Sequence, residues 1–172
     1  MFPHPRRLVS AALLSVLLGA AAPRAQGAAP PRFGFGFDAV GAFPGQDLLP
    51  EGVAVGIRGR AALPVNADLS VAADIGLLAN LWDGSADARY VLNPQTSVIV
   101  TLPSRGSIRY VLGGFGGFIP LEGGGGGPTL HLGVGTAIPL RDTSLYLELD
   151  PSLLVGQDET TVAVAARVGV IF

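Results

Sequence analysis

From residue 32 onward, the sequence alternates between apolar residues and small or polar residues with a period of two. The clearest case is the final segment, VAVAARVGVIF, in which a single charge, Arg167, lies in the middle of the alternation. Successive side chains of a β-strand point to opposite faces, so this period predicts strands. Beyond the first 30 residues, no segment of useful length has a helical period. We therefore expect an all-β fold.

The alternation predicts eight strands, at residues 32–43, 53–64, 68–80, 86–102, 107–119, 129–139, 143–156 and 160–172. The connections after the second, fourth and sixth strands are short (PVNA, PSRG and LRDT), and the other connections are longer on average. Consecutive strands joined by short turns pair antiparallel. The sequence thus predicts an antiparallel meander with tight turns at one end and longer loops at the other.

The fourth of these segments contains Asn93-Pro94, a pair that is typical of turns. The alternation nevertheless continues across Pro94, with Leu92 and Val98 on the same face. Proline is tolerated in a strand where the hydrogen-bond ladder is locally broken. We predict one continuous strand that is disturbed at Pro94.

The charged residues within the strands are expected to share one face of the alternation, and the opposite face is apolar. They are Asp38, Arg58, Arg60, Asp74, Arg89, Arg109, Glu148, Asp150 and Arg167. Lys is absent from the whole sequence. A soluble β-sandwich or ligand-binding barrel would carry more numerous charges, rich in Lys, on its outer face. A few arginines balanced by carboxylates suit a narrow interior instead, because guanidinium groups pair bidentately with carboxylates.

The apolar face is then the outside of the molecule. The chain is 49% hydrophobic and 14% charged, whereas soluble domains carry about 25% charged residues. A wall of outward Val, Leu and Ile suits lipid, where a sheet must close on itself to satisfy its backbone. Eight tilted strands of this length span an apolar band of about 25 Å. The predicted fold class is an all-β, eight-stranded antiparallel up-and-down transmembrane β-barrel.

The N-terminal segment has the organisation of a secretory signal peptide. Arg6 and Arg7 precede an apolar stretch from Leu8 to Ala22, and Ala25-Gln26-Gly27 provides small residues at a cleavage site. This stretch is shorter than the roughly 20 residues that a transmembrane helix needs. We expect residues 1–27 to be the signal peptide and residues 28–172 to form the barrel.

Aromatic residues are expected at both rims of the barrel, as in membrane barrels generally. The predicted outward residues at one rim are Phe33, Tyr110 and Phe172, and those at the other rim are Phe43, Trp82 and Phe118.

Residues 31–172 resemble the small eight-stranded bacterial outer-membrane β-barrels of the OmpA-like and opacity-protein-like kind. The resemblance lies in Gly-rich strands and polar hairpins, such as IRYVLGGFGGF and LHLGVGTAIPLRDTSLYLELD. It implies an outer-membrane location in a Gram-negative (diderm) bacterium, with outer-membrane lipid and, during insertion, the barrel-assembly machinery as partners. The last strand resembles the family's C-terminal insertion signal, formed here by Val164, Ala166, Val168, Val170 and Phe172.

Catalytic chemistry is weakly supported by the sequence. The chain has no Cys, and His131 is the one histidine beyond the N-terminal segment. Some barrels of the family modify lipid A with a His, a Ser and an acid. The strand of His131 offers Thr129 but no Ser, so we expect His131 to bond Glu148 or water instead. We expect no enzymatic activity, no cofactor and no bound metal.

The expected function is a structural or interaction role for a monomeric barrel plugged by Arg–carboxylate pairs. The alternative is a narrow, porin-like pore for ions or small solutes, and a lipid A-modifying enzyme is a distant third possibility. The acid-rich balance outside the N-terminal segment offers no basic surface for nucleic acid.

Overall fold

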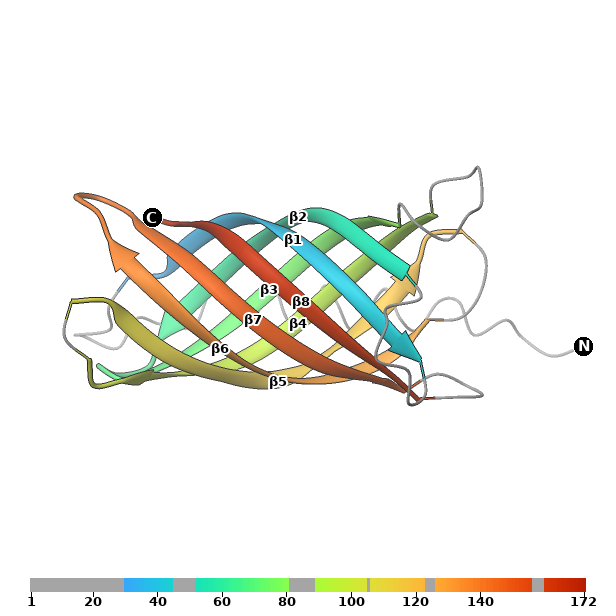
Figure 1. The fold of residues 1–172 in the computed structure, drawn as a ribbon. Helices are drawn as coiled ribbons and strands as arrows, with labels where there is room; N and C mark the ends of the chain where they lie inside the picture. The colour runs from blue at the N-terminus through green and yellow to red at the C-terminus, as the bar shows by residue number, and fades with distance from the viewer. Residues whose placement is uncertain (1–29, 45–51, 81–88, 105, 123–125, 156–159) are drawn as a thin grey trace, which may run out of the picture.

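The computed structural model describes residues 30–44, 52–80, 89–104, 106–122, 126–155 and 160–172. These residues form a closed barrel of eight tilted strands (Figure 1). The strands are β1 (Arg32–Pro44), β2 (Gly52–Pro64), β3 (Leu69–Asn80), β4 (Arg89–Leu102), β5 (Ile108–Pro120), β6 (Gly127–Pro139), β7 (Ser144–Val155) and β8 (Thr160–Ile171). Each strand pairs antiparallel with its neighbours in sequence. The predicted fold class is confirmed, and the strand bounds differ from the prediction by a few residues at most.

The barrel closes where β1 pairs antiparallel with β8, and we call this pairing the seam. The start of β1 and the end of β8 lie at the same end of the barrel (Figure 1). Two reciprocal backbone hydrogen bonds join Phe33 and Phe172 there, at 3.0 and 2.8 Å. The three short turns lie at this end, which we call the turn end; their described residues are 65–68, 103–104 with 106–107, and 140–143. The opposite end is the loop end.

The turns at the turn end are built from local hydrogen bonds. In the β2–β3 turn, the side-chain oxygen of Asn66 accepts bonds from the amides of Asp68 and Leu69, each 2.9 Å long. In the β4–β5 turn, Gly106 has a φ of 90°, in the region that favours glycine. These turns fix how each hairpin aligns, and therefore which residues lie opposite one another.

Residues 89–102 form one strand through Pro94, as predicted. Pairing between β4 and β5 is interrupted at Asn93 and Pro94, because proline has no amide hydrogen to donate. The Asn93 side chain compensates by donating a 2.9 Å hydrogen bond to the carbonyl of Gly117 on β5.

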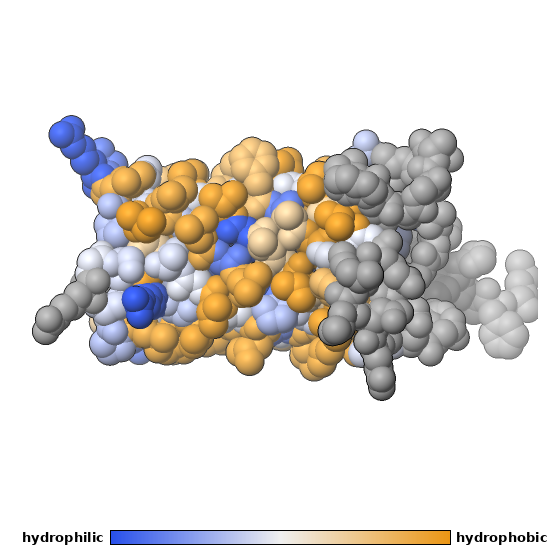
Figure 2. All heavy atoms as spheres, in the orientation of Figure 1, coloured by the Kyte–Doolittle hydropathy of each residue, from blue (hydrophilic) through white to orange (hydrophobic). Residues whose placement is uncertain are grey.

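The polar face of the alternation lies inside the barrel and the apolar face lies outside. Along β1, Gly34, Gly36 and Asp38 are buried, while Phe33, Phe35 and Phe37 are 44–58% exposed. Hydrophobic residues cover much of the outer wall (Figure 2). Among the described residues, no helix is long and apolar enough to cross a membrane.

Strand β5 is the exception to the predicted faces. Arg109 is exposed on the outer wall and Tyr110 is buried inside, so the prediction that Arg109 faces the interior is wrong. Phe118 packs against buried Val40 and its neighbours instead of facing outward. Arg109 is the second residue of its strand, next to the turn end, where a long cationic side chain can reach polar surroundings. Trp82 lies outside the described residues.

The interior is divided into three layers along the barrel axis. At the loop end, Val40, Leu78, Ala163 and Ala165 form a buried apolar cluster. At the turn end, Tyr110, Leu112, Ala137 and Tyr146 form a second one. The buried charges lie between these two clusters, so each layer of apolar side chains separates the charges from one end of the barrel.

Candidate functional site

Seven of the nine charged residues predicted for the interior are buried there. They are Asp38, Arg58, Arg60, Asp74, Glu148, Asp150 and Arg167, each 5% exposed or less. Arg109 lies outside the barrel, and the side chain of Arg89 is outside the described part of the chain. The described interior therefore combines three arginines with four carboxylates.

Two of the arginines extend from β2 across the interior. Arg58 donates to Asp38 on β1 at 2.7 Å and also bonds the side chains of Gln95 and Asn93 on β4. Arg60 donates to Asp74 on the neighbouring β3 at 2.6 Å. Charge-assisted bonds of this length are stronger than neutral ones. Arg58 thus adds a side-chain link to the backbone pairing of β2 with β1, and it joins β2 to β4, with which β2 has no backbone pairing.

Glu148 on β7 joins two arginines, one on the adjacent β8 and one on the more distant β2. Arg60 binds its two carboxylate oxygens at 2.8 and 3.1 Å, and Arg167 on β8 binds one of them at 2.6 Å. The Tyr110 hydroxyl donates a further bond at 3.2 Å. Arg60 also lies 5.4 Å from the centre of the Tyr146 ring, within cation–π range. Glu148 is the most highly connected of the buried carboxylates.

Arg167 connects strands that are distant in the barrel. Beyond Glu148, it lies 2.7 Å from a carboxylate oxygen of Asp150, and it donates to Gln95 at 2.8 Å. Its Nε lies 3.7 Å from Asp38 across the seam. The sequence prediction considered charges only, and so it missed the uncharged members of this network, Asn93, Gln95 and Tyr110.

The sequence predicts that His131 bonds Glu148 or water, whereas its partner in the structure is Asp150. Its Nδ1 donates to the Asp150 carboxylate at 3.0 Å, and its Nε2 lies 3.4 Å from the Ser97 hydroxyl oxygen. Ser97 reaches His131 from β4 because Gly114, which lies between them in register, has no side chain. The histidine thus lies between the serine and the aspartate, as in the triad of a hydrolytic enzyme. All three are buried, with Ser97 only 1% exposed, so a substrate could not reach its hydroxyl in the closed barrel.

Inward glycines leave the space that the large interior side chains occupy. A Cβ added at Gly135 would overlap the Tyr110 ring, and one at Gly169 would approach the Tyr146 ring within 2.6 Å. At outward Gly59, by contrast, the nearest atom would be the Ile75 Cγ2, at 3.9 Å. The Gly-rich composition thus reflects how tightly the barrel interior is filled.

We expect Gly135→Ala to lower the free energy of unfolding by about 1–3 kcal/mol, the usual cost of overpacking a filled core. Gly59→Ala is the matched control and should remain within about 0.5 kcal/mol of the wild type. Both values can be measured by urea titration of the protein folded in detergent micelles. Equal stability of the two variants would contradict this packing of Tyr110 against Gly135.

Comparison with known proteins gives a match at the level of fold. No family model matches the sequence, and no curated protein is similar to it. The crystal structure of neisserial surface protein A has a TM-score of 0.70 at 14% identity, covering 85% of this chain and 98% of that one. Ail, the attachment invasion locus protein of Yersinia pestis, has a TM-score of 0.52 at 12% identity, covering 83% and 97%. The chain has the small OmpA-like eight-stranded barrel fold.

Proposed function

We propose that this OmpA-like barrel is an integral outer-membrane protein of a Gram-negative bacterium with a structural or interaction role. The observation that carries the proposal is the reversed polarity of the wall. Arg58 and Arg167 are almost fully buried in the interior, whereas Leu132 and Phe115 are 71% and 64% exposed on the outside. Exposed apolar surface on this scale is unfavourable in water and favourable in lipid.

In this proposal, residues 1–27 direct export and are removed. The barrel-assembly machinery then inserts the chain, with the outward face of β8 as its recognition element, and the turn end faces the periplasm. Val168, Val170 and Phe172 on that face are 37–62% exposed, as a lipid-facing strand requires. Outer-membrane lipid is the main partner, and the barrel acts as a monomer.

A plugged interior favours the structural or interaction role over a pore. An eight-stranded barrel is just wide enough for its side chains to fill. Here Glu148 and Asp150 hold arginines across the centre, and an apolar cluster lies on each side of them. The same enclosure of Ser97 and His131 argues against catalysis.

Two measurements on the mature protein test this function. Purified from membranes, the unheated protein should migrate differently from the boiled protein on a detergent gel, because a closed barrel resists detergent until heated. Its incorporation into planar bilayers should then produce no conductance steps. Recovery as a soluble periplasmic protein without a mobility shift would overturn the membrane location. A mobility shift together with regular conductance steps would favour the narrow pore.

A further inference from the structure

The outer wall carries a shallow groove that runs across β5–β8, β1 and β2. It consists of two adjoining depressions, of about 490 and 630 Å³, that share Leu147, Ala166 and Arg167. The floor follows the inward row Gly135–Glu148–Arg167–Asp38–Gly56 in the strand register. Outward residues of the two adjacent rows form its walls.

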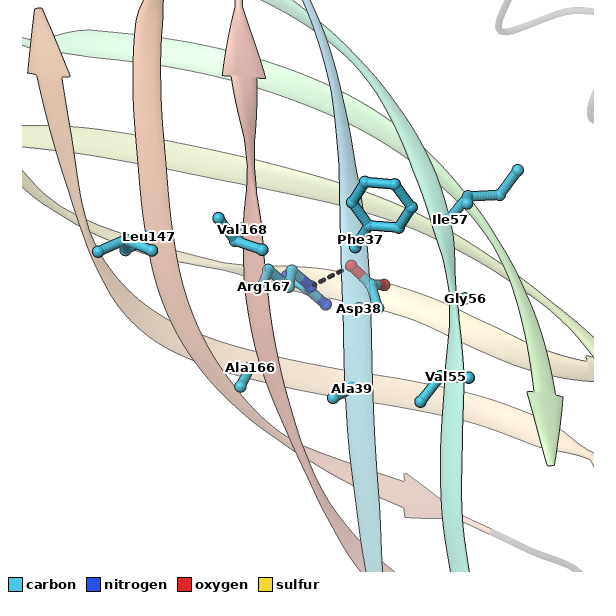
Figure 3. A pocket seen from close by; sticks show the side chains of 10 residues that line it. All are labelled: Phe37, Asp38, Ala39, Val55, Gly56, Ile57, Leu147, Ala166, Arg167 and Val168. Carbon is cyan, nitrogen blue, oxygen red and sulfur yellow. Dashed lines mark ion pairs between the residues drawn. The ribbon is translucent and has the colours of Figure 1, made fainter. Parts of the chain in front are cut away.

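One wall of the groove includes two small residues. Ala166 and Ala39 lie side by side across the seam, on the opposite side of the Arg167–Asp38 row from the larger side chains of Leu147, Val168 and Phe37 (Figure 3). The lining exposes mainly apolar atoms, although Asp38 and Arg167 pair beneath it. In shape and polarity, this depression suits a flexible hydrocarbon chain.

The groove has a cationic side chain at its end nearest the turn end. Arg109 is exposed on the outer wall, one residue inside the β5 strand end, and its register partner Thr136 provides a hydroxyl group on the same face. Within the described part of the chain, no carboxylate forms an ion pair with Arg109. Its guanidinium is therefore available to an anion at the turn end.

The strand register shows that the groove runs from the turn end toward the middle of the barrel wall. One wall follows the row Arg109–Thr136–Leu147–Val168–Phe37–Ile57. Arg109 is at the turn end of its strand, whereas Phe37 and Ile57 lie near the middle of β1 and β2. A cationic site at the membrane rim thus leads into an apolar groove that ends at mid-wall.

We propose that this groove binds one anionic glycerophospholipid of the periplasmic leaflet. Its phosphate lies against Arg109 and Thr136, and an acyl chain follows the groove past Leu147 to Ala166 and Ala39. This inference rests on the proposed membrane location, with the turn end facing the periplasm. The cation at the turn end favours a negatively charged headgroup. The apolar groove runs from there toward the middle of the wall, as the acyl chain of a bound lipid would.

The test is native mass spectrometry of the mature protein in detergent micelles with added dioleoyl phosphatidylglycerol, using dioleoyl phosphatidylcholine as the zwitterionic comparison. Arg109→Gln should weaken phosphatidylglycerol binding about fivefold, the effect of one basic group near a headgroup, and should affect phosphatidylcholine less. Ala166→Leu fills the groove and should weaken the binding of both lipids.

Two matched controls separate this site from general membrane affinity. Arg141→Gln removes an exposed arginine from the β6–β7 turn, and Ala73→Leu enlarges an outward alanine away from the groove. Both should bind as the wild type does. Equal loss in Arg141→Gln and Arg109→Gln, or wild-type binding by Arg109→Gln, would overturn the site. If the lipid site fails this test in a protein that still shows the heat-dependent mobility shift, the proposed function stands without the lipid site.

Discussion

Replacing Glu148 with Gln is expected to lower the free energy of unfolding by about 3 kcal/mol. The substitution keeps the shape of the side chain but removes the negative charge between Arg60 and Arg167. Removing one partner of a buried ion pair typically costs about 3–5 kcal/mol, because the remaining charge stays buried. The lower end of this range applies here, because Arg60 remains paired with Asp74 and Arg167 remains paired with Asp150.

Urea titration of the refolded protein in micelles measures this effect. Asp142→Asn, at an exposed acid of the β6–β7 turn, is the control and should stay within about 0.5 kcal/mol of the wild type. A Glu148→Gln protein as stable as this control would mean that the interior charges are hydrated and that the Arg–carboxylate pairs do not support the barrel.

The second large effect is expected on the outside, at Leu132. This residue is 71% exposed near the middle of β6, so Leu132→Arg places a charge halfway up the wall. In a membrane barrel, such a charge at the bilayer midplane costs roughly 2–4 kcal/mol, measured as the loss of unfolding free energy in lipid vesicles. On a water-facing wall the same substitution would be nearly neutral.

Val65→Arg provides the comparison for that experiment. Val65 is 61% exposed in the β2–β3 turn, beyond the end of the strands, so its substitution should change stability by less than about 0.5 kcal/mol. Similar small effects at both positions would place the whole wall in water and would remove the basis for an outer-membrane function.

The sequence allows a prediction of which side chains share a face of the sheet, because the side-chain period of a strand is two in any alignment with its neighbours. Asp38 and Arg167 therefore had to share one side of the sheet with the other buried charges. Arg109 shows the limit of this reasoning. Its charge suggested an inward position, but the strand places Tyr110 inside, where the hydroxyl meets Glu148 and Gly135 leaves room for the ring.

Partners could not be predicted in the same way, because they depend on register and on distance across the interior. Arg60 and Glu148 are 88 residues apart in sequence and lie on strands that are not neighbours. Similarly, His131 meets Ser97 only because the hairpin alignments place both beside Gly114. No local pattern around His131 indicates that a serine from β4 would reach it.

Closure at the seam has a consequence for how the barrel assembles. Seven of the strand pairings join sequence neighbours, whereas β1 and β8 meet only after the chain has come full circle. Contacts of such long range form slowly, because the entropy of closing the ring opposes them. Asp38 and Arg167 lie on the two sides of the seam, so an open sheet would leave this ion pair unformed. We therefore expect partly closed intermediates to be disfavoured, with ring closure and charge pairing in one cooperative folding step.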